Sequence, residues 1–80
     1  MPRYHFNIRN GHGFTRDEEG LELSSDADAQ RQAVKGARSL ISADVMDGTL
    51  DLGGQIEVTD DENDEVMTVR YCDVVKIVQG

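Results

Sequence analysis

The sequence lacks most of the features that would place it outside the class of small globular domains. It has one cysteine, Cys72, so no intramolecular disulfide can form and nothing indicates secretion. No segment approaches the roughly 18 consecutive apolar residues of a membrane span, and the start has no apolar signal core. We therefore expect a cytoplasmic protein without a membrane partner.

Positive charge is also scarce. Eight Lys and Arg stand against 16 Asp and Glu, which gives a formal net charge of −8. The acids concentrate in residues 17–28 and residues 57–65, and neither stretch contains a Lys or Arg. Because such a field repels phosphate backbones and anionic headgroups, no nucleic-acid partner is expected. A basic partner or a cation would suit it better.

Large apolar side chains are few. The 80 residues include two Phe, two Tyr and no Trp, and 38% of the residues are hydrophobic. This length supports one domain, residues 1–80, with one small core. The balance between burial and conformational entropy is tight in such a domain, so dimerisation would help to stabilise it.

The first segment alternates with a period of two. Tyr4, Phe6 and Ile8 face one way, which predicts a half-buried strand over residues 3–9. The opposite, solvent-facing row is predicted to be Arg3, His5, Asn7 and Arg9. The dipeptide Asn10-Gly11 tolerates positive φ and favours a tight hairpin turn, with a short return strand at residues 14–16.

The next part changes from a strand pattern to a helical one. Residues 17–20 indicate a turn, and Leu21 and Leu23 offer two side chains to the core. Residues 24–26 provide oxygens for a helix start, and a helix is predicted from there to Asp47, with Gly48 as its left-handed stop. Its predicted apolar stripe consists of Ala33, Val34, Ala37, Leu40, Ile41 and Val45.

The last part predicts a strand hairpin. Ile56 and Val58 alternate inward in residues 55–59, residues 60–64 form a polar turn, and residues 65–71 return. The apolar run in residues 73–78 fits either a last strand or one helical turn. The whole pattern predicts a two-layer α+β domain, an antiparallel sheet of three to four strands with one long helix on one face. The order of the strands does not follow from the pattern.

Three blocks of this sequence resemble a known family. They are MPRYHF at the start, DEEGLEL at residues 17–23, and IEVTD with EVMTV at residues 56–69. Together they resemble short, mostly alphaproteobacterial proteins known as a domain of unknown function. The resemblance supports the fold and a bacterial cytoplasmic setting, and it implies no activity, substrate or site residue.

The two histidines are the first candidates for a site. His5 and His12 with Asp17 or Glu18 could nominally supply the three or four ligands of a zinc site. The spacing matches no zinc pattern, and no cysteine lies near them in sequence. A strand histidine and a turn histidine explain both residues more simply, so no metal or other cofactor is expected.

Calcium binding and catalysis have less support. A calcium loop that starts at Asp60 would carry Glu65 at its required glycine and Tyr71 at its required glutamate. Cys72 stands beside Asp73, without the positive surroundings that favour a thiolate. The segments GHG and LGGQ are too short to cradle a phosphate. We therefore expect a protein that is not an enzyme.

The predicted helix carries the one local concentration of positive charge. Arg31, Lys35 and Arg38 recur at helical spacing beside the apolar stripe. A solvated face whose cations pair with Asp28 and neighbouring acids is the favoured interpretation, and weak contact with nucleic acid is the alternative.

The leading hypothesis is a non-enzymatic protein–protein interaction or regulatory module. It would contact a protein partner, a second copy of the chain included, through a sheet edge or a charged surface. The candidate contact residues are Arg3, His5, Asn7, Arg9, Arg31, Lys35 and Arg38. The alternatives are a small metal-binding protein or enzyme that uses His5 and His12, and weak nucleic-acid binding through the helix.

Overall fold

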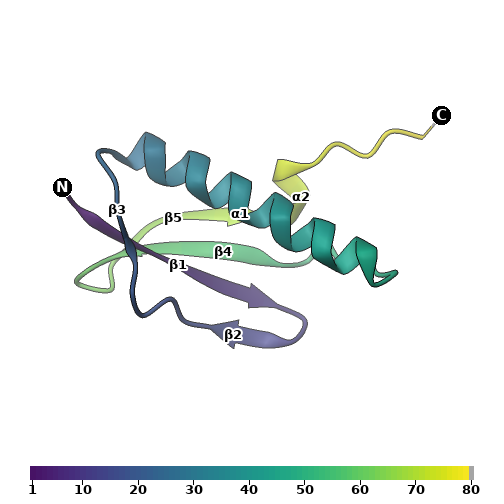
Figure 1. Cartoon of the computed structure of the whole chain (residues 1–80), viewed down its shortest axis with the longest axis horizontal. Helices are drawn as coiled ribbons and strands as arrows, with labels where there is room; N and C mark the ends of the chain where they lie inside the picture. Colours follow the sequence, from purple (N-terminus) through teal and green to yellow (C-terminus); the bar gives the residue numbers. More distant parts are fainter. Residues whose placement is uncertain (80) are drawn as a thin grey trace.

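The fold is a five-stranded antiparallel sheet with one long helix packed across one face. The computed structural model describes residues 1–79. The strand path is β2-β1-β4-β5, and β3 also pairs with β1 (Figure 1). The elements are β1 (Arg3–Asn10), β2 (Gly13–Thr15), β3 (Leu21–Glu22), α1 (Asp26–Met46), β4 (Gln55–Asp60), β5 (Glu65–Arg70) and α2 (Tyr71–Val74). This confirms the predicted α+β class.

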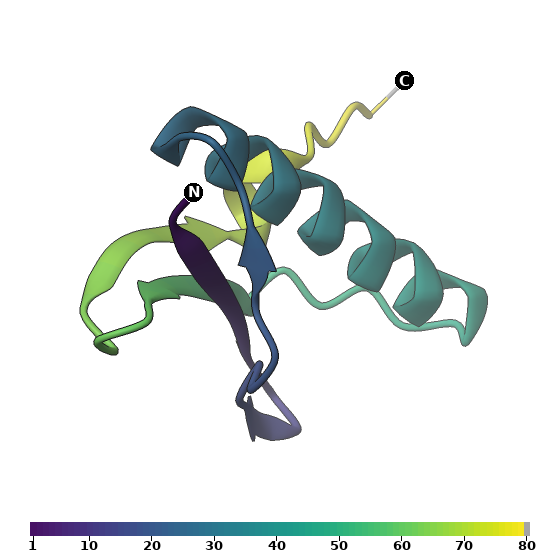
Figure 2. The same ribbon diagram turned by 60° about the vertical axis from the view of Figure 1, so that its left-hand side comes forward.

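The core lies between α1 and one face of the sheet, as Figure 2 shows from the side. Ala29, Ala33 and Ala37 are fully buried on the helix. Their small side chains let α1 lie close to the sheet, where Ile56 and Val58 of β4 are also buried. The predicted inward positions of the β4 strand are therefore confirmed.

The start and end of α1 follow the predicted signals. Ser25 is the N-cap, and its hydroxyl accepts a hydrogen bond from the backbone N–H of Asp28 at 3.2 Å. Gly48 follows the helix with a φ of +89°, the left-handed conformation expected of a helix stop. No helix in residues 1–79 is long and apolar enough to cross a membrane.

Two predicted core residues, Val45 and Leu21, are exposed instead. Val45 is 51% exposed because α1, with 21 residues, is about 31 Å long and extends past the strands. Figure 1 shows its C-terminal end beyond the sheet. Leu21 is 41% exposed on a strand of two residues at the sheet margin, and Leu50 is exposed in the connection after the helix.

The first hairpin is confirmed, but a different residue takes the positive φ. Asn10 ends β1 and pairs with Gly13, so Gly11 and His12 form the turn. The side chain of Asn10 accepts a hydrogen bond from the backbone N–H of His12 at 2.9 Å. The positive φ that was predicted at Asn10-Gly11 occurs instead at Gly13, which follows the turn with a φ of +122°.

The segment after β5 is one helical turn followed by extended chain. Tyr71, predicted as the last strand residue, begins α2, where it and Val74 are buried and close the core. The aromatic ring of Tyr71 lies against Gly54, since a Cβ there would stand 2.6 Å from the ring. Residues after Val74 form neither a strand nor a helix up to Gln79.

The buried hydroxyl of Tyr71 leads to a prediction. Within the described residues it makes no hydrogen bond of good geometry, although the Asn10 side chain lies near it, and burial raises the pKa of Tyr71. Tyr71→Phe should therefore change the free energy of unfolding by less than about 0.5 kcal/mol, or increase it. Tyr4→Phe should lower it, because the Tyr4 hydroxyl donates to Asp26 Oδ1 at 2.7 Å. Urea unfolding of both variants measures the contrast, and equal losses would contradict it.

Candidate interaction surface

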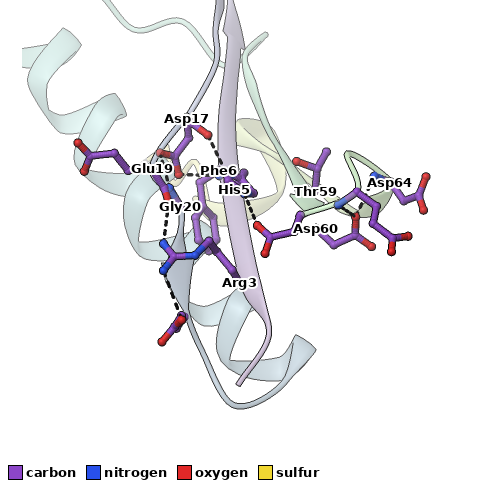
Figure 3. Close-up of polar contacts among 12 residues, drawn as sticks. Arg3, His5, Phe6, Asp17, Glu19, Gly20, Thr59, Asp60 and Asp64 are labelled. Carbon is purple, nitrogen blue, oxygen red and sulfur yellow. Dashed lines mark hydrogen bonds and ion pairs between the residues drawn. The ribbon is translucent and has the colours of Figure 1, made fainter.

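The helix-free face of the sheet does not present the predicted solvent-facing row. Arg3, His5, Asn7 and Arg9 do lie on that face, opposite the core-facing residues of β1. Only Arg9 is exposed, however, and Asn7 is just 4% exposed. The reason is that the loop between β2 and β3 folds over this part of β1, as Figure 3 shows.

Asp17 holds that loop in place with both its backbone and its side chain. Its carboxylate accepts the backbone N–H of Phe6 at 3.0 Å and that of Gly20 at 3.2 Å. Its own N–H donates to Asn7 Oδ1 at 2.9 Å. The Asn7 amide in turn donates to the Glu57 carbonyl and the Thr59 hydroxyl, both at 3.1 Å. Every polar atom of the buried Asn7 side chain is therefore satisfied.

These contacts complete the hydrogen bonding on the outer side of β1, which the short strands β2 and β3 cover only in part. The outer edge of β1 pairs with β2 near its end and with β3 at its start, which leaves a gap at Phe6. The Asp17 carboxylate occupies that gap and accepts the Phe6 N–H in place of a strand carbonyl. At this position the loop thus supplies the hydrogen-bond acceptor that a continuous neighbouring strand would supply.

His5 joins the loop to the tip of the β4–β5 hairpin. Its Nδ1 lies 2.8 Å from the Asp17 carbonyl oxygen, and its Nε2 lies 2.9 Å from Asp61 Oδ1. Both neighbours are hydrogen-bond acceptors, so only the protonated ring, which has two N–H donors, satisfies both contacts. The hydrogen bonds to Asp61 and to the Asp17 carbonyl raise the pKa of His5 above its ordinary value.

This pairing predicts a pH dependence of stability. Because the folded chain favours the protonated His5 ring, its contribution is complete below a pH of about 6.5, the unfolded pKa. The contribution is lost as pH rises through the raised folded-state pKa. Thermal unfolding of wild type should therefore show a fall in stability over that window.

His5→Gln should remove this part of the pH dependence. His12→Gln is the matched control, since the exposed His12 side chain has no hydrogen bond to any described residue. A wild-type profile that stays flat above neutral pH, or one that His12→Gln changes as much as His5→Gln does, would contradict the assignment.

The remaining cations of the row also have partners within the chain. Arg3 donates to the Glu19 carbonyl at 2.7 Å and pairs with Glu22 at 3.3 Å. Arg9 pairs with Glu57 at 2.7 Å, and this contact lowers the pKa of Glu57. Its guanidinium also stacks 4.6 Å from the centre of the Phe14 ring. The side chains of this row therefore mainly connect β1 to the loop between β2 and β3 and to the β4–β5 hairpin.

The metal-site candidates do not form one cluster, although His5 and Asp17 are in contact. His5 lies at the start of β1 and His12 in the turn after its end, roughly 20 Å apart along an extended strand. Both ring nitrogens of His5 are used by protein atoms, and Glu18 is exposed on the loop. Within residues 1–79 no group of three or more His, Cys, Asp or Glu side chains is placed to hold a metal ion.

The acidic hairpin tip owes its shape to hydrogen bonds within the turn. Asp60 Oδ1 accepts the backbone N–H groups of Glu62 at 2.9 Å and Asp64 at 3.0 Å (Figure 3). Asn63 takes the left-handed conformation, with a φ of +66°. Asp60, the first position of the hypothetical calcium loop, is thus engaged with the backbone of its own turn.

The basic residues of α1 line one flank of the helix. Arg31, Lys35 and Arg38 border a groove of about 470 Å³ whose other lining residues are Ala27, Gln30 and Val34. Arg31 pairs with Asp28, and hydrogen bonds from Ser24 and Arg31 lower the pKa of Asp28. Arg38 Nε donates to the Val74 carbonyl at 2.8 Å. Among the described residues, Lys35 has no partner.

The opposite edge of the sheet, β5, is open. Tyr71 N–H donates to the Gly54 carbonyl at 2.9 Å, and hydrogen-bonded pairs alternate along an antiparallel ladder. Val69 and Met67 therefore point their backbone groups at β4, whereas Thr68 and Arg70 point theirs outward. Within the described residues, the backbone N–H and carbonyl of Thr68 and the N–H of Arg70 have no partner, whereas the Arg70 carbonyl accepts the first hydrogen bond of α2.

Sequence patterns do not reveal this open edge, because strand order decides which strand is outermost. The alternation and turns indicated the β4–β5 hairpin but left its neighbours undefined. The role of Asp17 had a partial signal, since an Asp three residues before a Gly is typical of a side-chain-stabilised turn. Nothing in the pattern showed that the same carboxylate reaches Phe6.

Comparison with known proteins gives a family and no function. No curated protein and no solved structure matches the chain. The pattern that defines one protein family matches residues 3–72, which contain all five strands and α1. Because this match covers far more than half of the sequence, the chain belongs to the family described as Domain of unknown function (DUF6894).

Proposed function

We propose that this chain is a non-enzymatic protein–protein interaction module whose β5 edge accepts an extended segment of a protein partner. The single observation that carries the proposal is the contrast between the two sheet edges. The outer side of β1 is covered by the short strands β2 and β3 and by the Asp17 carboxylate, whereas Thr68 at the centre of β5 presents an unpaired backbone N–H and carbonyl.

An open edge is a ready template for an added strand. Backbone hydrogen bonds supply affinity in such complexes, and alternate side chains supply specificity. Proteins that do not use an edge commonly shield it with a strand, a loop or a covering helix. Here one side of the sheet ends in two very short strands, β2 with three residues and β3 with two, whereas the other side ends in the six-residue β5.

The β5 edge has features that restrict what can pair with it. Glu65 and Arg70 place opposite charges at its two ends, and the ladder to β4 is irregular between Val58 and Thr59. Charges and irregularities at an edge discourage indiscriminate association. They leave the centre of β5, around Thr68, as the part available to a complementary segment.

The test is a substitution at the outward position. Thr68→Pro removes the outward N–H without breaking the ladder to β4, since proline is tolerated at such edge positions. Thr68→Val keeps that N–H and is the matched control, because both variants lose the Thr68 hydroxyl contact with Glu65. Circular dichroism of both proteins establishes that they fold.

A photoreactive residue at Glu65 reports the partner in cells of the native host. We expect crosslinked proteins in wild type and Thr68→Val, and loss of those products in Thr68→Pro. The same photoreactive residue at Glu18, on the loop between β2 and β3, should give none of them. Equal products from Thr68→Pro and Thr68→Val would contradict the proposal.

A further inference from the structure

The chain contains an extended segment that has no strand partner of its own. Residues 75–79 follow α2, and Val75 has a φ of −129° and a ψ of 150°, the conformation of a strand. Ile77 is 61% exposed and Val78 is 76% exposed. Three of these five residues are β-branched, which is the composition typical of strands.

The segment is directed away from the body of its own chain. Tyr71 and Val74 anchor α2 in the core, and Arg38 Nε donates to the Val74 carbonyl at 2.8 Å. Figure 1 shows the chain leaving α2 away from the sheet. In this arrangement residues 75–79 do not pair with the β5 strand of their own chain.

One chain thus presents both halves of a strand pair: an open edge at β5 and an unpaired strand-like segment at residues 75–79. We propose that residues 75–79 of a second copy add to the β5 edge, so that two copies exchange these segments reciprocally. This inference rests on the proposed function, because it names one occupant for the same edge.

The side chains favour one antiparallel register. Placing Lys76 of the second copy opposite Thr68 aligns the outward backbone groups of β5 with those of the incoming segment. Ile77 then stands beside Met67 and Val75 beside Val69, so apolar groups meet on the helix side. Lys76 comes within reach of Glu65, whose carboxylate accepts the Thr68 hydroxyl.

Charge and size are consistent with this occupant. The segment carries Lys76 and no acidic residue, while the hairpin tip beside β5 is strongly acidic. The family match ends at residue 72, so the segment is a feature of this chain outside the matched region. In this register, pairing would also cover the exposed side chain of Ile77 on the helix side.

The test is the oligomeric state of the full chain, measured by light scattering over a wide range of concentration. Wild type is expected to form a concentration-dependent dimer. Thr68→Pro, which blocks the edge, and Ile77→Lys, which disables the segment, should each weaken dimerisation by more than about tenfold. Thr68→Val should dimerise as wild type does.

Mixing the two defective variants separates segment exchange from other modes of pairing. Thr68→Pro keeps a working segment and Ile77→Lys keeps a working edge, so the mixture should recover a heterodimer with one exchanged segment. If two β5 edges paired with each other instead, the mixture would gain nothing.

Three results would overturn the inference: a monomeric wild type at every concentration, a dimer that persists in Ile77→Lys, or a mixture that does not associate. None of them affects the crosslinking test, where loss of partner products in Thr68→Pro would still support the proposed function. Failure of that test together with successful mixing would instead restrict the edge to self-association.

Discussion

Replacing Asp17 with alanine is expected to lower the free energy of unfolding by about 2–4 kcal/mol. The substitution removes the acceptors of the Phe6 and Gly20 N–H groups, at 3.0 and 3.2 Å. A polar group left without a partner at a partly buried position costs more than the net gain of one hydrogen bond. The loop that covers Asn7 also loses its main attachment to β1.

Glu18→Ala is the matched control for this result. Glu18 is the exposed neighbour of Asp17 on the same loop, so its loss should change stability by less than about 0.5 kcal/mol. Asp17→Asn, which keeps one acceptor oxygen, should fall between the two. Urea unfolding measures all three variants, and an Asp17→Ala protein as stable as Glu18→Ala would show that the carboxylate does not hold the edge.

The second large effect is expected at Gly20. A Cβ at this position would lie 2.9 Å from both the Tyr4 carbonyl oxygen and His5 Cε1, and 3.0 Å from Arg3 Cγ. The residue also has a φ of +72°, which side chains rarely adopt. Strain and overpacking together should make Gly20→Ala less stable by about 2–4 kcal/mol.

Gly48→Ala separates the two causes. Gly48 has a similar positive φ of +89°, but a Cβ there would meet nothing within 4 Å. The decrease in the free energy of unfolding caused by Gly48→Ala should therefore reflect backbone strain alone, about 1 kcal/mol. Thermal unfolding of both variants provides the comparison. A Gly20→Ala cost no larger than that of Gly48→Ala would mean that the loop moves aside without loss.

These two residues change how the MPRYHF and DEEGLEL blocks are understood. Arg3, His5 and Phe6 come from the first block, and Asp17 and Gly20 from the second. In the folded chain they contact one another (Figure 3). The pattern that could have indicated a metal or catalytic half-site around His5 instead builds the covered outer side of β1.

The sequence predicted local structure well where periodicity and capping act within a few residues. The α1 helix, its Ser25 cap and the β4–β5 hairpin follow from such signals. The exposure of Val45 does not follow from such signals, because it depends on the length of the helix relative to the sheet.

The candidate surface was harder to predict because it depends on contacts between distant segments. Alternation placed His5 and Asn7 on the correct face, but the loop that covers them begins ten residues later. The Asp61 contact of His5 spans 56 residues. Likewise, β5 is open only because β4 pairs with β1, a choice that no local pattern encodes.

Residue-resolved amide hydrogen exchange of the dilute monomeric chain tests the contrast between the two sheet edges most directly. The Phe6 amide should exchange slowly, like the Val69 amide within the β4–β5 ladder, because the Asp17 carboxylate accepts it. The Thr68 and Arg70 amides should exchange rapidly, because they point away from the sheet. A fast Phe6 amide, or Thr68 and Arg70 amides as slow as that of Val69, would contradict the account.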